Sequence, residues 1–203
     1  MFKTFTIFAA ALLASSIVAA QTAPPASPTV RLRGTIEKLE PGFVTIKERR
    51  GETIKLIMAE NTPMNEVYPI KLEDIKAGGY VGTAAVPGPN GTLDAVEVHV
   101  FMESQRGTGE GHNPWDLLPE STMTNATVAD LAVAPNGRTL TLKYKGGEKV
   151  VNVKEGAPVV TYRPAEKSLL MVGAKVLIIA QEKDGKPTAL RMTIGRDGFA
   201  PPM

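Results

Sequence analysis

Two stretches of the chain, residues 30–101 and 126–195, carry the same short motifs in the same order. The offset between matching motifs drifts by only a few residues, and the drift falls at turn-forming positions. Such an ordered series indicates an internal duplication, so the fold has to be built from two related units. The matching pairs, first copy and then second, are Gly34-Thr35-Ile36 with Ala126-Thr127-Val128, Thr45-Ile46-Lys47 with Thr141-Leu142-Lys143, Gly51-Glu52 with Gly147-Glu148, and Asn90-Gly91 with Asp184-Gly185.

Apolar and polar residues alternate within each copy with a period of two, which is typical of half-buried β-strands. At the start of the first copy, Val30 and Leu32 alternate with Arg31 and Arg33. The segment 72–75 is long enough for one helical turn, and a pair of glycines follows to end it. Each copy therefore predicts three strands, one short helix and two more strands.

This order of elements is that of an OB-type barrel, which closes a small sheet and so protects its edges. We expect an all-β fold of two tandem five-stranded OB-like barrels, each with one short helix, over residues 30–101 and 126–195. The segment 176–180 is apolar on both faces, which fits a strand buried between a barrel and its neighbour. The alternative is that the two copies merge into one larger barrel or sandwich.

The motifs Gly34-Thr35-Ile36, Val44-Thr45-Ile46 and Asn90-Gly91, together with Val81 and Ala95, resemble those of a bacterial exported family of unknown function with OB-like repeats. Both copies show the pattern, and it covers most of the chain after the N-terminal segment. The matching residues are mainly turn and core positions. The resemblance therefore implies a fold and a compartment and implies no activity.

The N-terminal residues 1–20 have the pattern of a signal peptide: Lys3, an apolar stretch, and small residues before Gln21. The apolar stretch is shorter than the ~20 residues that span a bilayer, so we expect cleavage rather than a membrane anchor. A disordered tether over residues 21–29 and a flexible tail over 196–203 complete the predicted organisation. Because the chain has no cysteine, a bacterial periplasmic or secreted location is favoured over a eukaryotic secretory route.

The composition argues against nucleic acid as a partner. Lys and Arg total 23 against 21 acidic residues, and aromatic residues make up 5% of the chain. This balance provides neither a strong positive field nor a platform for stacking bases. The arginines of the first strands, Arg31, Arg33, Arg49 and Arg50, are therefore interpreted as a solvated strand face.

The Gly-rich connection over residues 102–125 is long for a link between two units, and connections of this length are usually functional or disordered. It contains the only tryptophan of the chain and one of its two histidines. We expect Arg106, Glu110, His112, Trp115 and Asp116 to form a loop that contacts a partner. The structural alternative is that Trp115 and the leucines after it pack between the two units.

A metal site in this loop is a second hypothesis. Glu110, His112 and Asp116, with His99 or Glu103, could bind a divalent ion, because imidazole and carboxylate ligands both suit borderline metals. The spacing has no repeated histidine pattern to support it. His99 itself is expected on the exposed face of its strand, because the valines on either side of it face inward.

Motifs for catalysis are missing from the sequence. The glycines at 107, 109 and 111 do not have phosphate-loop spacing, and no serine stands in a nucleophile-elbow context. We therefore expect a non-enzymatic periplasmic binding or scaffold protein with no cofactor, which presents the inter-repeat loop to an envelope protein or a small ligand. The alternative is a periplasmic accessory protein that handles a divalent metal.

Overall fold

A computed structural model describes residues 27–135 and 137–202. The predicted signal peptide and most of the predicted tether lie outside the described residues. The strands are β1 (Thr29–Glu40), β2 (Phe43–Glu48), β3 (Thr53–Ile57), β4 (Met64–Pro69), β5 (Tyr80–Pro87), β6 (Leu93–Val100), β7 (Gly111–Pro114), β8 (Thr122–Ala134), β9 (Gly137–Tyr144), β10 (Gly147–Lys154), β11 (Val159–Pro164), β12 (Lys175–Lys183) and β13 (Lys186–Gly195).

The prediction of an all-β fold is confirmed. The helical elements of the described residues are single 3-10 turns, and the turn Leu72–Asp74 stands where the short helix is predicted. Its counterpart in the second copy is the turn Lys167–Leu169. Nowhere in the described part of the chain is a helix long and apolar enough to cross a membrane.

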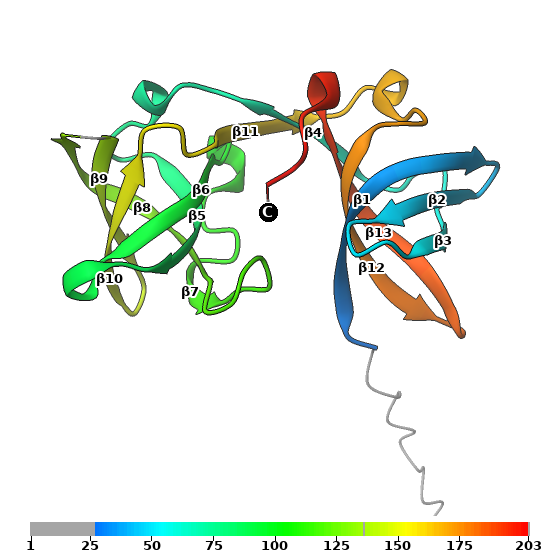
Figure 1. Cartoon of the computed structure of the whole chain (residues 1–203), viewed down its shortest axis with the longest axis horizontal. Coiled ribbons are helices and arrows are strands. Elements are labelled where there is room, and N and C mark those ends of the chain that lie inside the picture. Colours follow the sequence, from blue (N-terminus) through cyan, green and yellow to red (C-terminus); the bar gives the residue numbers. More distant parts are fainter. Residues whose placement is uncertain (1–26, 136, 203) are drawn as a thin grey trace, which may run out of the picture.

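The strands form two closed rings, which appear as the two lobes of Figure 1. The terminal ring joins β1, β2 and β3 from the first copy to β13 and β12 from the second. The central ring joins β8, β9 and β10 from the second copy to β6 and β5 from the first. Each ring therefore contains three strands of one copy and two strands of the other.

The strands β4 and β11 connect the rings. They pair antiparallel with each other, with Val67 opposite Tyr162, and they span the top of the molecule between the two lobes (Figure 1). In addition, β4 runs parallel to β13 and β11 runs parallel to β6. The result is one 13-stranded mixed sheet.

The prediction of two separate barrels, one per copy, is therefore wrong. The alternation of polar and apolar residues specifies which face of a strand is buried, but not which strand lies beside it. Since the two copies are related, the edge of β1 can accept β12 in place of β5. The first three strands of each copy are completed by the last two strands of the other copy.

The pairings of the two copies are equivalent. Gly34 on β1 lies opposite Val176, and Ala126 on β8 lies opposite Val81, at matching positions of the two copies. The register of β1 with β2 shifts after Ile36, and that of β8 with β9 shifts after Val128. The strand β7, which pairs with β8, has no counterpart in the other ring within the described residues.

Each ring encloses its own hydrophobic core. Burial of these side chains is the main source of stability, at about 1.5–3 kcal/mol for each large aliphatic residue. The central core includes Val81, Val98, Val128, Leu140, Leu142 and Val151, and the terminal core includes Ile36, Ile46, Leu56, Val176, Ile178 and Ile194.

The turn between β12 and β13 is a two-residue hairpin. Asp184 and Gly185 have φ values of 51° and 71°, and Lys183 pairs with Lys186 on either side of them. Positive φ at both positions fits a turn that follows the twist of its strands, and glycine adopts it without strain. The Asp-Gly motif thus predicts this turn correctly.

The C-terminal segment packs against the connecting strands. Arg196 forms an ion pair with the buried Glu66 on β4, with 3.2 Å between Nη1 and Oε1. Phe199 packs against Val67, Val160 and Tyr162, and Pro201 is buried. Residues of the segment for which a flexible tail is predicted, 196–203, therefore contact a small core on β4 and β11.

Candidate functional site

The linker between the copies folds back onto the central ring instead of projecting from it. Its strand β7 pairs with β8, with His112 opposite Thr124. Before that strand, the Arg106 guanidinium donates hydrogen bonds to the Gly78 carbonyl at 2.9 Å and to the Thr127 hydroxyl at 3.3 Å. These contacts fix both halves of the linker, so it forms a wall and not a free loop.

The end of the linker reaches across to the terminal ring. Asp116 accepts two hydrogen bonds from the buried Arg33 on β1, at 2.9 and 3.3 Å. The Arg31 guanidinium lies over the Trp115 ring, 3.9 Å from its centroid, in cation–π geometry. Two adjacent linker residues therefore hold two arginines of the same strand.

The two arginines lower the pKa of the Asp116 carboxyl. Burial acts to raise the pKa of its carboxyl, but the hydrogen bonds from Arg33 and the charges of Arg33 and Arg31 outweigh burial and lower the pKa below its usual value. The side chain remains 45% exposed, so the pair is a surface pair in energetic terms.

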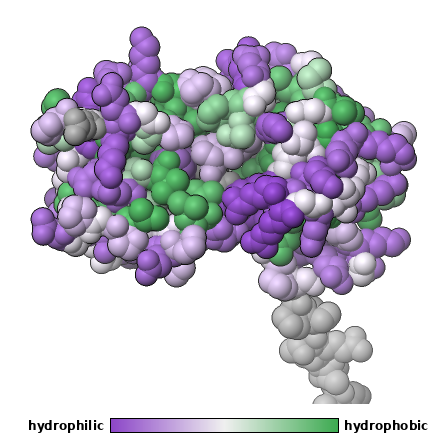
Figure 2. Space-filling view, in the orientation of Figure 1, coloured by the Kyte–Doolittle hydropathy of each residue, from purple (hydrophilic) through white to green (hydrophobic). Residues whose placement is uncertain are grey.

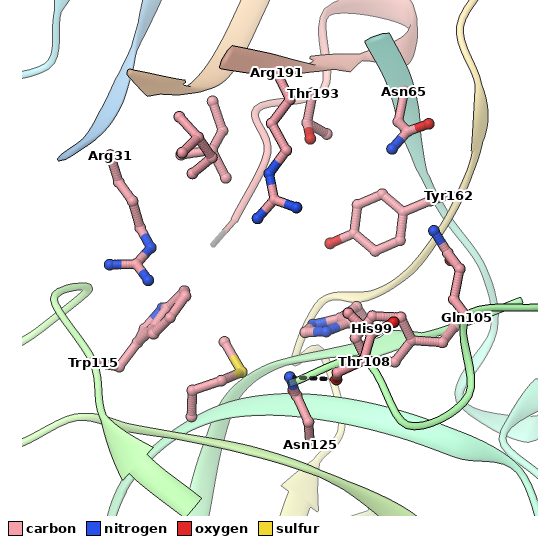
Figure 3. Close-up of a pocket in the computed structure, with 14 residues that line it drawn as sticks. Arg31, Asn65, His99, Gln105, Thr108, Trp115, Asn125, Tyr162, Arg191 and Thr193 are labelled. Carbon is pink, nitrogen blue, oxygen red and sulfur yellow. Dashed lines mark hydrogen bonds between the residues drawn. The ribbon is translucent and has the colours of Figure 1, made fainter. Parts of the chain in front are cut away.

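A cavity of about 190 Å³ lies between the two rings (Figure 3). One water requires only ~10–15 Å³, so the space has room for a small molecule. It is smaller than the ~300–1,000 Å³ of pockets for drug-sized ligands. Its walls come from both rings, from β4 and β11, and from the linker: Arg31, Asn65, His99, Phe101, Gln105, Thr108, Trp115, Met123, Asn125, Tyr162, Leu177, Ile179, Arg191 and Thr193.

The floor of the cavity includes a buried histidine. His99 is 3% exposed, and its Nδ1 lies 3.3 Å from Oε1 of Glu97, which is fully buried. Its ring packs edge-on against Phe101, at 4.6 Å between centroids, and against Tyr162, at 5.7 Å. The expectation of an exposed His99 is therefore wrong. Glu97, His99 and Phe101 do point away from the central core, but that face is covered by β11 and the linker.

Gly82 makes room for this histidine. A Cβ atom at Gly82 would overlap Nε2 of His99 and Oδ1 of Asn125. The strand β5 therefore needs a residue without a side chain where it passes under the cavity. Leu177 stands at the equivalent position of β12 and lines the opposite wall.

Buried polar atoms without hydrogen-bond partners gather around the cavity. Across the described residues these atoms are Oε2 of Glu97, Oε1 of Gln105, Nε1 of Trp115 and Oδ1 of Asn125. Gln105, Trp115 and Asn125 line the cavity, and Glu97 contacts His99, which also lines it. Buried polar groups in folded proteins are nearly always hydrogen-bonded, so this cavity is the candidate site of the molecule.

The charge that faces the cavity is positive. Arg31 and Arg191 both extend toward its open centre (Figure 3), and neither Asp nor Glu is among the described residues that line it. Arg191 forms no ion pair with a carboxylate within the part of the chain that the structure describes. Beside it, burial raises the pKa of the Tyr162 hydroxyl well above its usual value, and the charge of Glu97 adds to the effect.

The residues predicted for the site divide into two groups. Trp115 lines the cavity, and Asp116 fixes the strand that carries Arg31. Arg106, Glu110 and His112 hold the linker to the central ring instead. Oε1 of Glu110 accepts a hydrogen bond from the Lys145 amide at 2.9 Å, and Nδ1 of His112 lies 2.8 Å from the Thr124 hydroxyl.

The structure does not bring Glu110, His112 and Asp116 together as metal ligands. Among the described residues, no group of three or more His, Asp or Glu side chains is placed to hold an ion. Burial, followed by the charge of Lys149, lowers the pKa of His112.

Arg191, Asn65 and Tyr162 line the cavity and are not among the residues predicted for the site. Arg191 and Thr193 lie on the same face of β13. This face is opposite the buried apolar residues, and the alternation therefore predicts that it is exposed. The strands β4 and β11, which carry Asn65 and Tyr162, lie outside the predicted set of elements.

Comparison with known proteins finds no matching family model, no similar curated protein and no similar solved structure. A function for this chain therefore has to be argued from the cavity itself.

Proposed function

We propose that this chain is a non-enzymatic binding protein of the bacterial envelope that takes a small molecule into the cavity between its two rings. The observation that carries the proposal is the set of buried polar atoms without partners, which surround a space large enough for a ligand. Leaving such groups unsatisfied costs about 1–3 kcal/mol each, and a ligand that bonds to them recovers that cost. Small-ligand sites typically combine an apolar lining with a few polar groups of this kind.

Binding is favoured over catalysis by the chemistry of the lining residues. An activated nucleophile has to lie within hydrogen-bond reach of its base. His99 is the only histidine in the lining, and neither Thr108 nor Thr193 has a hydrogen bond to it. The partner of the His99 ring is Glu97, which is itself buried.

In this proposal the linker contributes to the ligand site. Its residues Gln105, Thr108 and Trp115 form one wall of the cavity, so it presents side chains inward to a ligand. On the face shown in Figure 2, the most hydrophilic residues gather near the junction of the lobes, and an apolar patch lies on the lobe beside them.

We also propose that each ring is an OB-like barrel and that the protein is periplasmic. Around each ring the strands follow the order of an OB-like barrel, with the last two strands of each copy, β5 and β6 or β12 and β13, exchanged between the copies. The N-terminal pattern of residues 1–20 and the absence of cysteine support export to a bacterial periplasm. The mature protein then begins near Gln21.

A thermal-shift screen with a cavity-blocked variant tests the proposal. Residues 21–203 are screened against a small-metabolite library, alongside Thr193→Trp, which fills the cavity, and Thr53→Trp, which changes an exposed residue of β3. A ligand present at 100 times its Kd stabilises a protein by about 2.7 kcal/mol. We expect compounds that raise the Tm of the wild type and of Thr53→Trp, and leave that of Thr193→Trp unchanged.

Circular dichroism shows first that both variants are folded. If every stabilising compound acts equally on all three proteins, or if none acts on the wild type, the cavity is not a ligand site and the proposal fails.

A further inference from the structure

The cavity has a cationic end. Arg31 comes from β1 and Arg191 from β13, two strands of the terminal ring, and both guanidinium groups face the open centre in Figure 3. The Trp115 ring packs against the Arg31 guanidinium, with 3.9 Å between the ring centroid and Cζ, and so reduces the conformational freedom of the Arg31 side chain. The planar fork of a guanidinium matches the two oxygens of a carboxylate, and a supported arginine loses less entropy on binding one.

Two arginines, Arg31 and Arg191, line this end, and neither Asp nor Glu is among the described residues that line the cavity. Asp116 bonds to Arg33 at 2.9 Å and is 3.9 Å from Arg31, and Glu97 lies behind His99. A negatively charged group of a ligand would therefore face guanidinium groups and no carboxylate in the lining.

The remaining walls are largely apolar and aromatic. Leu177 and Ile179 on β12 face the cavity from one side, and Met123 on β8 faces it from another. The rings of Trp115 and Tyr162 stand on either side of the open centre in Figure 3. Aromatic side chains pack best against flat apolar groups, by offset stacking or edge-to-face contact.

The end of the cavity away from the arginines has acceptors that lack a donor. Nδ2 of Asn125 donates to the Thr108 carbonyl at 3.2 Å, which orients the amide and leaves its Oδ1 without a partner. Oε1 of Gln105, on the same side in Figure 3, is also unpartnered. A hydroxyl group on the ligand would donate to one of these oxygens.

We infer that the ligand is a small aromatic monocarboxylate with a hydrogen-bond donor at the end opposite its carboxylate. The carboxylate bonds to Arg191 and Arg31, the ring lies among Trp115, Tyr162 and the aliphatic wall, and the donor reaches Asn125. This inference rests on the proposed function and specifies its ligand class. The cavity volume of about 190 Å³ restricts the ligand to a single ring with small substituents.

Isothermal titration calorimetry on residues 21–203 tests each part of the inference. The probes are 4-hydroxybenzoate, benzoate without the donor, 4-hydroxybenzyl alcohol without the charge, acetate without the ring, and inorganic phosphate. We expect 4-hydroxybenzoate to bind most tightly. Loss of the carboxylate should weaken binding at least tenfold, and loss of the hydroxyl several-fold.

Two variants locate the contacts. Arg191→Gln should weaken 4-hydroxybenzoate at least tenfold, while Arg50→Gln, which makes the same charge change at an exposed arginine away from this cavity, should leave the affinity unchanged. Asn125→Leu should remove the preference for 4-hydroxybenzoate over benzoate, because the acceptor is lost and the cationic end remains.

The outcomes distinguish this inference from the proposed function. If the thermal-shift screen finds compounds that need the open cavity, but these are neutral or cationic, the ligand class is wrong and the binding function stands. Tighter binding of phosphate than of 4-hydroxybenzoate overturns the class as well. If no compound depends on the open cavity, both proposals fail together.

Discussion

The two rings share one framework and differ where they face each other. The core positions correspond in kind, as with Ile46 and Leu142, which are both fully buried. On the faces that the rings turn toward each other, Glu97 and His99 of β6 occupy the positions of Arg191 and Thr193 of β13. The copies have therefore kept the residues that build a ring and diverged at the residues that line the cavity.

This divergence makes the cavity asymmetric. The terminal ring provides Arg31 where the central ring provides Met123, and Thr193 where the central ring provides His99. A symmetric pair of copies would place like residues on both sides and could not orient a ligand with two different ends. The linker, whose strand β7 pairs with β8 of the central ring, adds Trp115 and Gln105 to the difference.

The largest expected effect comes from truncating the core of either ring. Ile46→Ala in the terminal ring and Leu142→Ala in the central ring each remove a fully buried side chain, at a cost of about 2–5 kcal/mol. Because each ring uses strands from both copies, we expect the rings to unfold together. Urea denaturation followed by circular dichroism should show one transition, shifted to lower urea in both variants.

Two separate transitions, with each substitution shifting only one of them, would contradict this coupling. Thr53→Ala, at an exposed position of β3, serves as a matched control and should leave the midpoint unchanged.

A smaller effect is expected at Gly82 of the central ring, whose equivalent in the terminal ring is Leu177. Gly82→Ala adds a methyl group against His99 and Asn125, and overpacking of this kind costs about 1–3 kcal/mol. The displaced His99 should also narrow the cavity. We expect Gly82→Ala to lower the urea midpoint and to weaken the ligands found by the thermal-shift screen.

Leu177→Ala is the complementary change in the other ring. It also lowers stability, because Leu177 is buried, but it enlarges the cavity that it lines. Bulkier ligands should therefore bind to this variant better than to the wild type.

Equal ligand affinities for Gly82→Ala and the wild type would show that His99 does not shape the cavity.

The smallest effect is expected from the contact between the linker and the terminal ring. Asp116 has a lowered pKa, so its pair with Arg33 contributes fully above the unfolded-state pKa of about 3.9 and is lost as the pH falls through the lower folded-state value. For a partly exposed pair the contribution is about 0–1 kcal/mol. Trp115 fluorescence should stay constant from pH 7 to about pH 4 and change below it.

In Asp116→Asn the same fluorescence change should be present already at pH 7, because the charge that holds Arg33 is lost. Asp130→Asn, at an exposed aspartate of β8, should behave as the wild type does. A wild-type change between pH 5 and 7 would mean that another group controls the linker.

Much of the fold follows from the sequence, and the exchange of strands does not. Period-two alternation identifies most strands, and Asp184-Gly185 predicts its hairpin. The strands β4 and β11 are short and end in prolines, Pro69 and Pro164, so no alternation is visible in them. The choice of partner for β1 depends on long-range contacts, which no local pattern encodes.

The site is predictable only in part, for a related reason. The composition of the linker indicates Trp115 and Asp116, because a lone tryptophan in a long polar loop needs something to pack against. His99 is expected on an exposed face because the alternation on β6 does not reveal that both faces of this strand are buried, and Arg191 is missed because it lies on the exposed face of β13. One face of β6 packs in a ring and the other faces the second ring, which is visible only once the rings are placed side by side.

The chain has one tryptophan, so its indole N–H gives a single, directly assignable signal in a ¹H–¹⁵N NMR spectrum. Because Nε1 of Trp115 is buried beside the cavity without a partner, titration with a compound from the screen should shift this signal, together with amides of both β6 and β13. Saturating shifts confined to one ring, with the indole signal unmoved, would contradict a ligand site between the rings.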